Sequence, residues 1–190
     1  MIIRLFVWFF NRKGWKIEGK GIPAQLNKCV IIAMPHTSNW DFVYSMAAIR
    51  LFNIELNYLA KKELFRWPIK SLFINTGGIP VERNKNTRMV DLMISKMNES
   101  GRLFLVIPAE GTRKRVEKIK SGFYHVALTT GVPICMAYLD YEKKTAGFSE
   151  PFYPTGNRNA DAAVIKDFFR DKKGKFPELF NPDAIKLDKN

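Results

Sequence analysis

Three short runs of almost uninterrupted apolar residues constrain the fold of this chain most strongly. They cover residues 28–34, 103–107 and 132–139. Each run is short for a helix and has no alternating polar positions, a pattern typical of a strand that is buried on both faces. Such strands occur mainly in parallel sheets with helices on both sides. The sequence therefore predicts an α/β fold with a largely parallel mixed sheet flanked by helices.

The segments between these runs have the residue patterns of helices and shorter strands. Helices are expected over residues 38–51, 86–101, 122–130 and 161–170, and strands over residues 54–60 and 79–82. Residues 61–75 look helical but contain Pro68, which predicts a kink or two short helices. Because no linker or repeat interrupts the alternation, residues 1–190 are interpreted as a single domain whose residues 175–190 form a C-terminal tail, either docked or loose.

The first 16 residues combine an apolar run with several cations. Residues 1–10 are apolar except for Arg4, and Arg12, Lys13 and Lys16 follow. This pattern suits an amphipathic interfacial helix on anionic lipid, and it equally suits a terminal helix packed on the domain's own core. The run is far shorter than the ~20 residues that span a bilayer, and it lacks the features of a secretory signal. We therefore expect a cytoplasmic protein, peripherally associated with the inner face of the membrane.

The formal net charge of +13 predicts an anionic partner, such as nucleic acid, an acidic lipid surface or a phosphorylated substrate. Residues 61–120 hold most of this excess, with fourteen Lys or Arg against six Asp or Glu. No nucleic-acid-binding motif accompanies the charge, so nucleic acid is not an expected partner. An anionic membrane surface and phosphorylated substrates remain.

The cysteines and one of the two histidines are interpreted as structural. Cys29 and Cys135 lie within apolar runs and form no Cys/His cluster, so we expect two buried thiols, no metal site and a reducing compartment. His125 lies in the apolar helix predicted over residues 122–130, where a satisfied structural histidine is expected rather than a second base. The remaining histidine, His36, is the candidate general base.

His36 directly follows the first apolar strand, and Asp41 falls in the first turn of the next predicted helix. A carboxylate that binds one imidazole nitrogen fixes the tautomer and leaves the other nitrogen free to act as a base. The chain has no G-x-S-x-G nucleophile elbow. A His–Asp pair without a protein nucleophile predicts that a hydroxyl or amine of the substrate itself attacks.

Two further polar clusters follow predicted strands. In the second cluster, Gly77 and Gly78 permit a tight turn, and Arg83 can bind a phosphate through two nitrogens. In the third, Glu110, Gly111, Thr112 and Arg113 follow one another and are candidates for a polar substrate pocket. Because ligands in α/β sheets bind beyond the carboxyl ends of the strands, we expect all three clusters at that edge.

In this order, the clusters resemble the motifs of the glycerolipid acyltransferase family, which contains the 1-acyl-glycerol-3-phosphate acyltransferases. The resemblance covers residues 28–140, and its four blocks are His36 with Asp41, then residues 78–83, 110–113 and 132–134. It implies an O-acyltransferase in which His36 deprotonates the acceptor hydroxyl and Asp41 holds the ring. It also implies an acceptor pocket with a phosphate site, formed by Arg83, Glu110, Gly111, Thr112 and Arg113.

The same resemblance implies a lysophospholipid acceptor and a fatty-acyl thioester donor, either acyl-CoA or acyl carrier protein. The donor is a co-substrate, and no separate cofactor is expected. Three alternatives stay open from the residues alone. They are acylation of another acceptor such as an amino-acid lipid, hydrolysis of an acyl thioester, and non-catalytic binding of anionic lipid.

Overall fold

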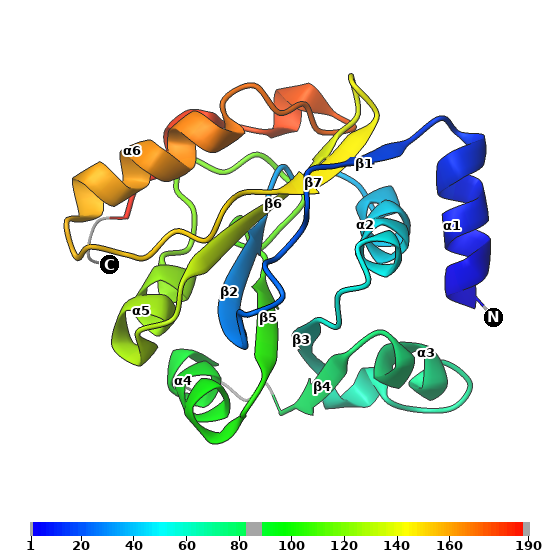
Figure 1. The fold of residues 1–190 in the computed structure, drawn as a ribbon, viewed down its shortest axis with the longest axis horizontal. Coiled ribbons are helices and arrows are strands. Elements are labelled where there is room, and N and C mark those ends of the chain that lie inside the picture. Colours follow the sequence, from blue (N-terminus) through cyan, green and yellow to red (C-terminus); the bar gives the residue numbers. More distant parts are fainter. Residues whose placement is uncertain (1, 83–88, 188–190) are drawn as a thin grey trace.

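A computed structural model of the chain describes residues 2–82 and 89–187, and a seven-stranded sheet lies at its centre (Figure 1). The strand order is β1-β7-β6-β2-β5-β3-β4, and all neighbours are parallel except β6 and β7. This arrangement confirms the predicted α/β fold with a largely parallel mixed sheet. The strands are β1 (Lys16–Glu18), β2 (Lys28–Ala33), β3 (Asn57–Lys61), β4 (Gly78–Val81), β5 (Leu103–Ile107), β6 (Ile134–Asp140) and β7 (Thr145–Phe148).

Helices cover both faces of the sheet, with α1 and α2 on one side and α4, α5 and α6 on the other (Figure 1). The α-helices are α1 (Ile2–Arg12), α2 (Trp40–Leu51), α3 (Lys70–Asn75), α4 (Met89–Glu99), α5 (Gly122–Thr130) and α6 (Arg158–Phe169). Short 3-10 helices span Lys62–Leu64, Pro177–Leu179 and Pro182–Ala184. The break expected at Pro68 is present, since residues 61–75 form a 3-10 turn and a separate short helix.

Burial on both faces explains why the central strand β2 has no polar residue after Lys28. Val30 and Ile32 of β2 pack into the core beneath α4, α5 and α6, whereas Cys29 and Ile31 point into the core beneath α2. The neighbouring β6 places Cys135 in the same α2-side core, so both thiols are buried as expected. The packing fixes the carboxyl end of β2, from which the candidate base emerges.

The structure differs from the sequence prediction mainly at short strands and helix ends. β1 and β7 were not expected, because three or four residues at the margin of a sheet show no clear apolar period. Helix α6 begins at Arg158 rather than at residue 161, since the Asn157 side chain accepts a hydrogen bond from the amide of Ala160 and caps the helix. Helix α2 begins two residues later than expected. The predicted start of α4 at residue 86 lies outside the described residues.

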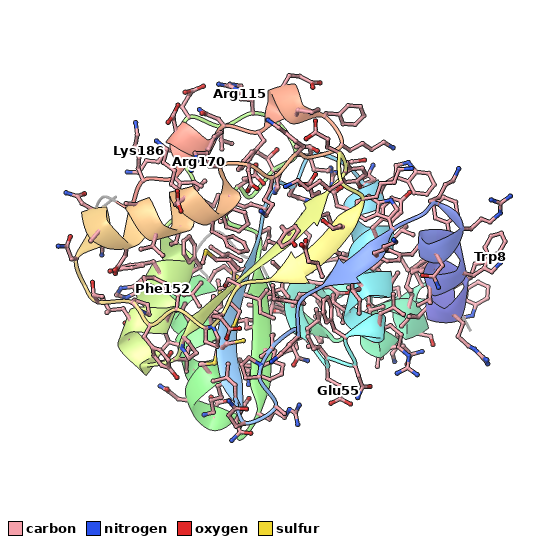
Figure 2. The ribbon with its side chains drawn as sticks, turned by 45° about the horizontal axis from the view of Figure 1, so that its top comes forward. Trp8, Glu55, Arg115, Phe152, Arg170 and Lys186 are labelled. Carbon is pink, nitrogen blue, oxygen red and sulfur yellow. The ribbon has the colours of Figure 1, made fainter. Side chains whose placement is uncertain are left out.

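Both ends of the described chain pack against the domain. The C-terminal tail is docked rather than loose, since Phe180, Ala184, Ile185 and Leu187 are buried in the main core. At the other end, Phe10 of α1 is fully buried, while Trp8 projects outward at the edge of the molecule (Figure 2). Within residues 2–82 and 89–187, no helix has both the length and the apolar character needed to cross a bilayer.

Candidate active site

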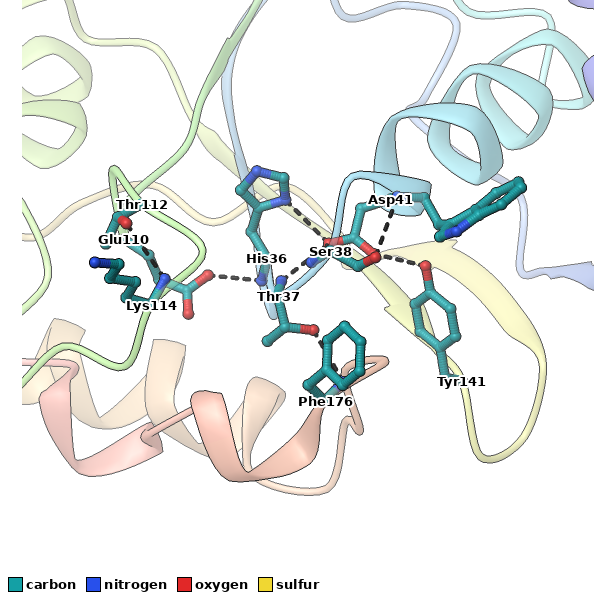
Figure 3. A network of polar contacts seen from close by, with 10 residues as sticks. His36, Thr37, Ser38, Asp41, Glu110, Thr112, Lys114, Tyr141 and Phe176 are labelled. Atoms are coloured by element: carbon teal, nitrogen blue, oxygen red, sulfur yellow. Dashed lines mark hydrogen bonds and ion pairs between the residues drawn. The ribbon is translucent and has the colours of Figure 1, made fainter.

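The loop between β2 and α2 carries the candidate base and its partner. His36 lies three residues beyond the end of β2, and Asp41 occupies the first turn of α2. His36 Nδ1 lies 3.0 Å from Asp41 Oδ2, and the second ring nitrogen, Nε2, points away from Asp41 (Figure 3). The His36 side chain is 30% exposed, whereas that of Asp41 is only 6% exposed. A buried carboxylate thus orients a ring whose free nitrogen is accessible.

Three further donors hold the Asp41 carboxylate in place. The backbone amides of Thr37 and Ser38 each donate to Oδ2 at 3.0 Å, and the Tyr141 hydroxyl donates to Oδ1 at 2.6 Å. Burial, and then the bond to Asp41, raises the pKa of Tyr141 well above its usual range, so this hydroxyl remains a donor. The carboxylate cannot rotate away from His36 without losing several of these bonds.

Tyr141 is itself fixed by a cluster of aromatic rings. The ring of Trp15 stacks on Tyr44 of α2 with centroids 4.4 Å apart, and it meets Tyr141 edge-on at 4.8 Å. Tyr44 also meets Tyr141 edge-on at 5.6 Å. This geometry is the favourable one for aromatic pairs. Sequence reasoning missed Tyr141, because it is 100 residues from Asp41 and stands in no motif.

Glu110 supports the same loop from the neighbouring strand. It follows β5, which pairs in parallel with β2, and its Oε2 accepts a hydrogen bond from the His36 backbone amide at 2.7 Å. Figure 3 shows this contact on the opposite side of His36 from Asp41. Glu110 is only 4% exposed, and its burial raises the pKa of the carboxyl to about 7 despite the opposing effect of the amide bond. The Glu110 carboxyl thus fixes the backbone of His36 through its amide.

The raised pKa of Glu110 predicts a pH-dependent stability. Between about pH 4.3 and pH 7, the Glu110 carboxyl is protonated in the folded state and ionised in the unfolded state. The free energy of unfolding therefore falls as pH rises through this range. Glu110→Gln keeps an acceptor for the His36 amide but cannot ionise. The wild type should therefore lose up to about 3 kcal/mol of unfolding free energy over this pH range that the variant keeps. Urea unfolding of both proteins between pH 4.5 and pH 8 tests it. A difference in unfolding free energy that does not change with pH would contradict the assigned pKa.

The other predicted substrate-binding residues lie farther out. Gly111 has a φ of +68°, a left-handed backbone conformation that favours glycine at this turn. Thr112 and Arg113 are exposed on the same loop, where the Thr112 hydroxyl accepts a hydrogen bond from the Lys114 amide at 3.3 Å. Arg83 lies outside the described residues. The strand before it, β4, is separated from β2 by β3 and β5.

An apolar cavity of about 330 Å³ opens beside the His36–Asp41 pair. It lies between α2 and the sheet, and both His36 and Asp41 contribute to its wall. Its apolar lining includes Phe42, Met46, Ile49, Phe52, Tyr58 and Val106. Helix α4 packs on the opposite face of the sheet, where Met97 is buried in the main core. An apolar chain therefore has room beside the pair.

Residues 173–176, between α6 and the rest of the C-terminal tail, cover another side of the His36 loop. The Phe176 amide donates to the Thr37 hydroxyl at 3.2 Å, and the Lys173 carbonyl accepts a bond from the Tyr141 amide at 2.8 Å. A Cβ on Gly174 would come within 2.7 Å of the Thr37 hydroxyl, so only glycine fits this approach without a shift. Residues 173–176 thus support Thr37 and Tyr141, two of the residues that donate to Asp41.

His125 does not have the expected environment. Its side chain is exposed on α5, because the buried face of that helix carries Phe123, Tyr124, Val126 and Ala127 instead. His125 is therefore not the structural histidine that the apolar helix led us to expect. Among the described residues, no group of three or more His, Cys, Asp or Glu side chains could hold a metal ion.

Comparisons with known proteins add a family and a related fold. Residues 16–139 match the family model described as Acyltransferase. Among solved structures, the chain is similar to the 1-acyl-sn-glycerophosphate (LPA) acyltransferase PlsC from Thermotoga maritima, with a TM-score of 0.58 and 21% sequence identity. That similarity covers 91% of this chain and 81% of the other. No curated protein matches the sequence.

Proposed function

Because the chain belongs to the acyltransferase family, we propose that it transfers a fatty-acyl group from a thioester to the hydroxyl of a lysophospholipid such as 1-acyl-glycerol 3-phosphate. The observation that carries this proposal is the 3.0 Å contact between His36 Nδ1 and Asp41 Oδ2 beside an apolar cavity. The contact leaves Nε2 available to an acceptor hydroxyl, and the cavity offers a site for a fatty chain.

The proposed reaction is direct transfer with no acyl-enzyme intermediate. His36 Nε2 takes the proton of the acceptor hydroxyl as its oxygen attacks the thioester carbonyl. Asp41 stabilises the imidazolium that forms. When the tetrahedral intermediate collapses, the carbon–sulfur bond breaks and the imidazolium returns its proton to the leaving thiolate. The products are the acylated acceptor and a free thiol.

The donor in this proposal is acyl-CoA or acyl carrier protein, used as a co-substrate without a further cofactor. Both donors are anionic, and the loop that follows Glu110 offers them a cluster of exposed cations. These cations are Lys114, Arg115, Lys118 and Lys120. In the acceptor site, Arg113 and Arg83 bind the phosphate, and Gly111 and Thr112 shape the loop around it.

The acyl chain occupies the apolar cavity in this account, and this placement predicts a change in chain-length preference. Ser45 lines the cavity from α2, so Ser45→Leu should shorten the space and reduce kcat/KM for a long-chain donor relative to a short one by at least about tenfold. The measurement is the ratio of the two values for purified enzyme. Val43→Leu adds bulk to the same helix outside the cavity lining and serves as the control. Equal ratios in both variants would contradict the placement.

A peripheral contact with the anionic inner face of the membrane completes the proposal. The amphipathic helix α1 supports it, because Ile2, Leu5 and Trp8 are exposed while the opposite side packs on the core. Arg4, Arg12 and Lys13 add positive charge at the same helix. A lipid acceptor would then be reached from the bilayer surface.

The acceptor is identified by a panel assayed with one long-chain acyl thioester. Lysophosphatidate, glycerol 3-phosphate, lysophosphatidylcholine and an N-acyl amino acid differ in phosphate, in chain and in headgroup. We expect lysophosphatidate to give the highest kcat/KM. Preference for the N-acyl amino acid would instead identify an amino-lipid acyltransferase, and would remove the need for a phosphate site.

A further inference from the structure

The segment between β3 and β4, residues 62–75, presents apolar side chains to solvent. Leu64, Ile69 and Ile74 are exposed, and Trp67 is 91% exposed, more than any other large apolar side chain among the described residues. We call residues 62–75 the Trp67 segment. Leaving an indole almost fully hydrated is unfavourable compared with burying it, so this surface favours a partner that removes it from water.

The Trp67 segment also has less exposed aromatic side chains that pack. The Phe65 and Phe73 rings contact each other with centroids 5.6 Å apart. A Cβ on Gly78 of β4 would lie 3.1 Å from the Phe65 ring, which shows how closely this ring approaches the strand. The segment therefore has an inner aromatic side that packs and an outer apolar side that does not.

The charge around the outer side fits one kind of partner. Exposed cations flank Trp67 in the sequence, and residues 61–75 contain four basic residues against a single acidic one, Glu63. The cations are Lys61, Lys62, Arg66 and Lys70, of which Lys62 forms an exposed ion pair with Glu82. Tryptophan prefers the interface between headgroups and acyl chains, and lysine and arginine next to it bind anionic headgroups. A bilayer surface supplies both environments at once.

The Trp67 segment also lies where a membrane contact would serve the candidate site. It directly follows β3, and Tyr58 and Leu59 of that strand line the apolar cavity. Figure 1 shows α3 at the same side of the molecule as the N-terminal end of α1. The domain could therefore touch one flat bilayer with both elements at once.

We propose that the Trp67 segment is a second membrane contact, in which Trp67 and its apolar neighbours enter the interfacial region of an anionic bilayer. Lys61, Arg66 and Lys70 bind the headgroups. The proposal rests on the proposed function only in that the acceptor is a lipid held in that bilayer. It concerns a different element from α1, and it adds a second fixed point that limits how the domain can rotate on the surface.

The test is sedimentation of the full-length protein with vesicles of phosphatidylglycerol and phosphatidylcholine, compared with vesicles of phosphatidylcholine alone. Trp67→Ser should weaken binding to the anionic vesicles by about tenfold or more. Arg66→Glu should weaken binding to anionic vesicles but not to zwitterionic ones. Tyr153→Ser, which removes an exposed aromatic side chain from the segment before α6, should bind as the wild type does.

Acyl transfer to a short-chain lysophosphatidate dissolved as monomers separates this proposal from the proposed function. Trp67→Ser should keep full activity on the dissolved acceptor and lose activity on the acceptor held in anionic vesicles. Unchanged vesicle binding by Trp67→Ser, or a loss that Tyr153→Ser shares, overturns the proposal. If vesicle binding is unchanged and Trp67→Ser instead weakens binding of acyl carrier protein, the surface docks a protein and the proposal is wrong.

Discussion

Replacement of His36 by alanine is expected to lower kcat for acyl transfer by at least about 10²–10⁴-fold, the usual contribution of a positioned general base. The His36 imidazole lines the cavity, and its Nε2 points away from Asp41, so this nitrogen is free to accept a proton. Without it, the acceptor hydroxyl must lose its proton to water as it attacks. The measurement is steady-state kinetics with a saturating acyl thioester and lysophosphatidate.

The His36→Ala protein should remain folded, which makes the kinetic loss interpretable. Its side chain is partly exposed, and Asp41 keeps three other donors when the ring is removed. An unchanged thermal melt is therefore expected. His125→Ala is the matched control, since that histidine is exposed on α5 and should be dispensable. Near-normal turnover by folded His36→Ala would refute the role of the base.

Asp41→Asn should lower kcat by about 10²-fold or more, but by less than His36→Ala. An asparagine oxygen placed at the Oδ2 position could still accept from His36 and from the Thr37 and Ser38 amides. The negative charge that stabilises the imidazolium would be gone. If the amide were turned the other way, its N–H group would face these donors and the wrong tautomer of His36 would be favoured.

Tyr141→Phe is the control that separates charge from position. It removes the 2.6 Å hydrogen bond to Oδ1 and leaves the Asp41 charge intact, so kcat should fall by no more than about tenfold. The two variants should therefore differ by at least an order of magnitude. Equal losses in both would mean that Asp41 acts by holding the loop and not by supporting a positive charge on His36.

The parts of the site that the sequence predicts are those encoded by short segments. The apolar run 28–34 ends just before His36, and Asp41 follows five residues later, which places both side chains in the loop and first helical turn at one end of the sheet. The same reasoning brings Glu110 close to His36, because two buried parallel strands often become neighbours, as β2 and β5 do. It did not predict that the Glu110 carboxyl would lie beneath the His36 amide.

The parts that could not be predicted depend on contacts between distant segments. Tyr141 reaches Asp41 only because the β6–β7 hairpin folds back along the sheet, and residues 173–176 reach Thr37 only after α6 has crossed the opposite face. The cavity is formed by side chains of α2 and of several strands together. In the sequence, each of these side chains has the pattern of an ordinary core residue. His125 was misjudged because an apolar helix can still expose one face.

Product analysis with the purified protein tests the central claim, that the His36–Asp41 pair activates an acceptor hydroxyl for direct transfer. A long-chain acyl thioester is supplied alone and then with lysophosphatidate, and thiol release, free fatty acid and phosphatidate are quantified by mass spectrometry. The account predicts little consumption of the donor alone and one phosphatidate per thiol released once the acceptor is present, with both lost in His36→Ala. Equal release of free fatty acid with and without acceptor, or phosphatidate formation that survives His36→Ala, would contradict it.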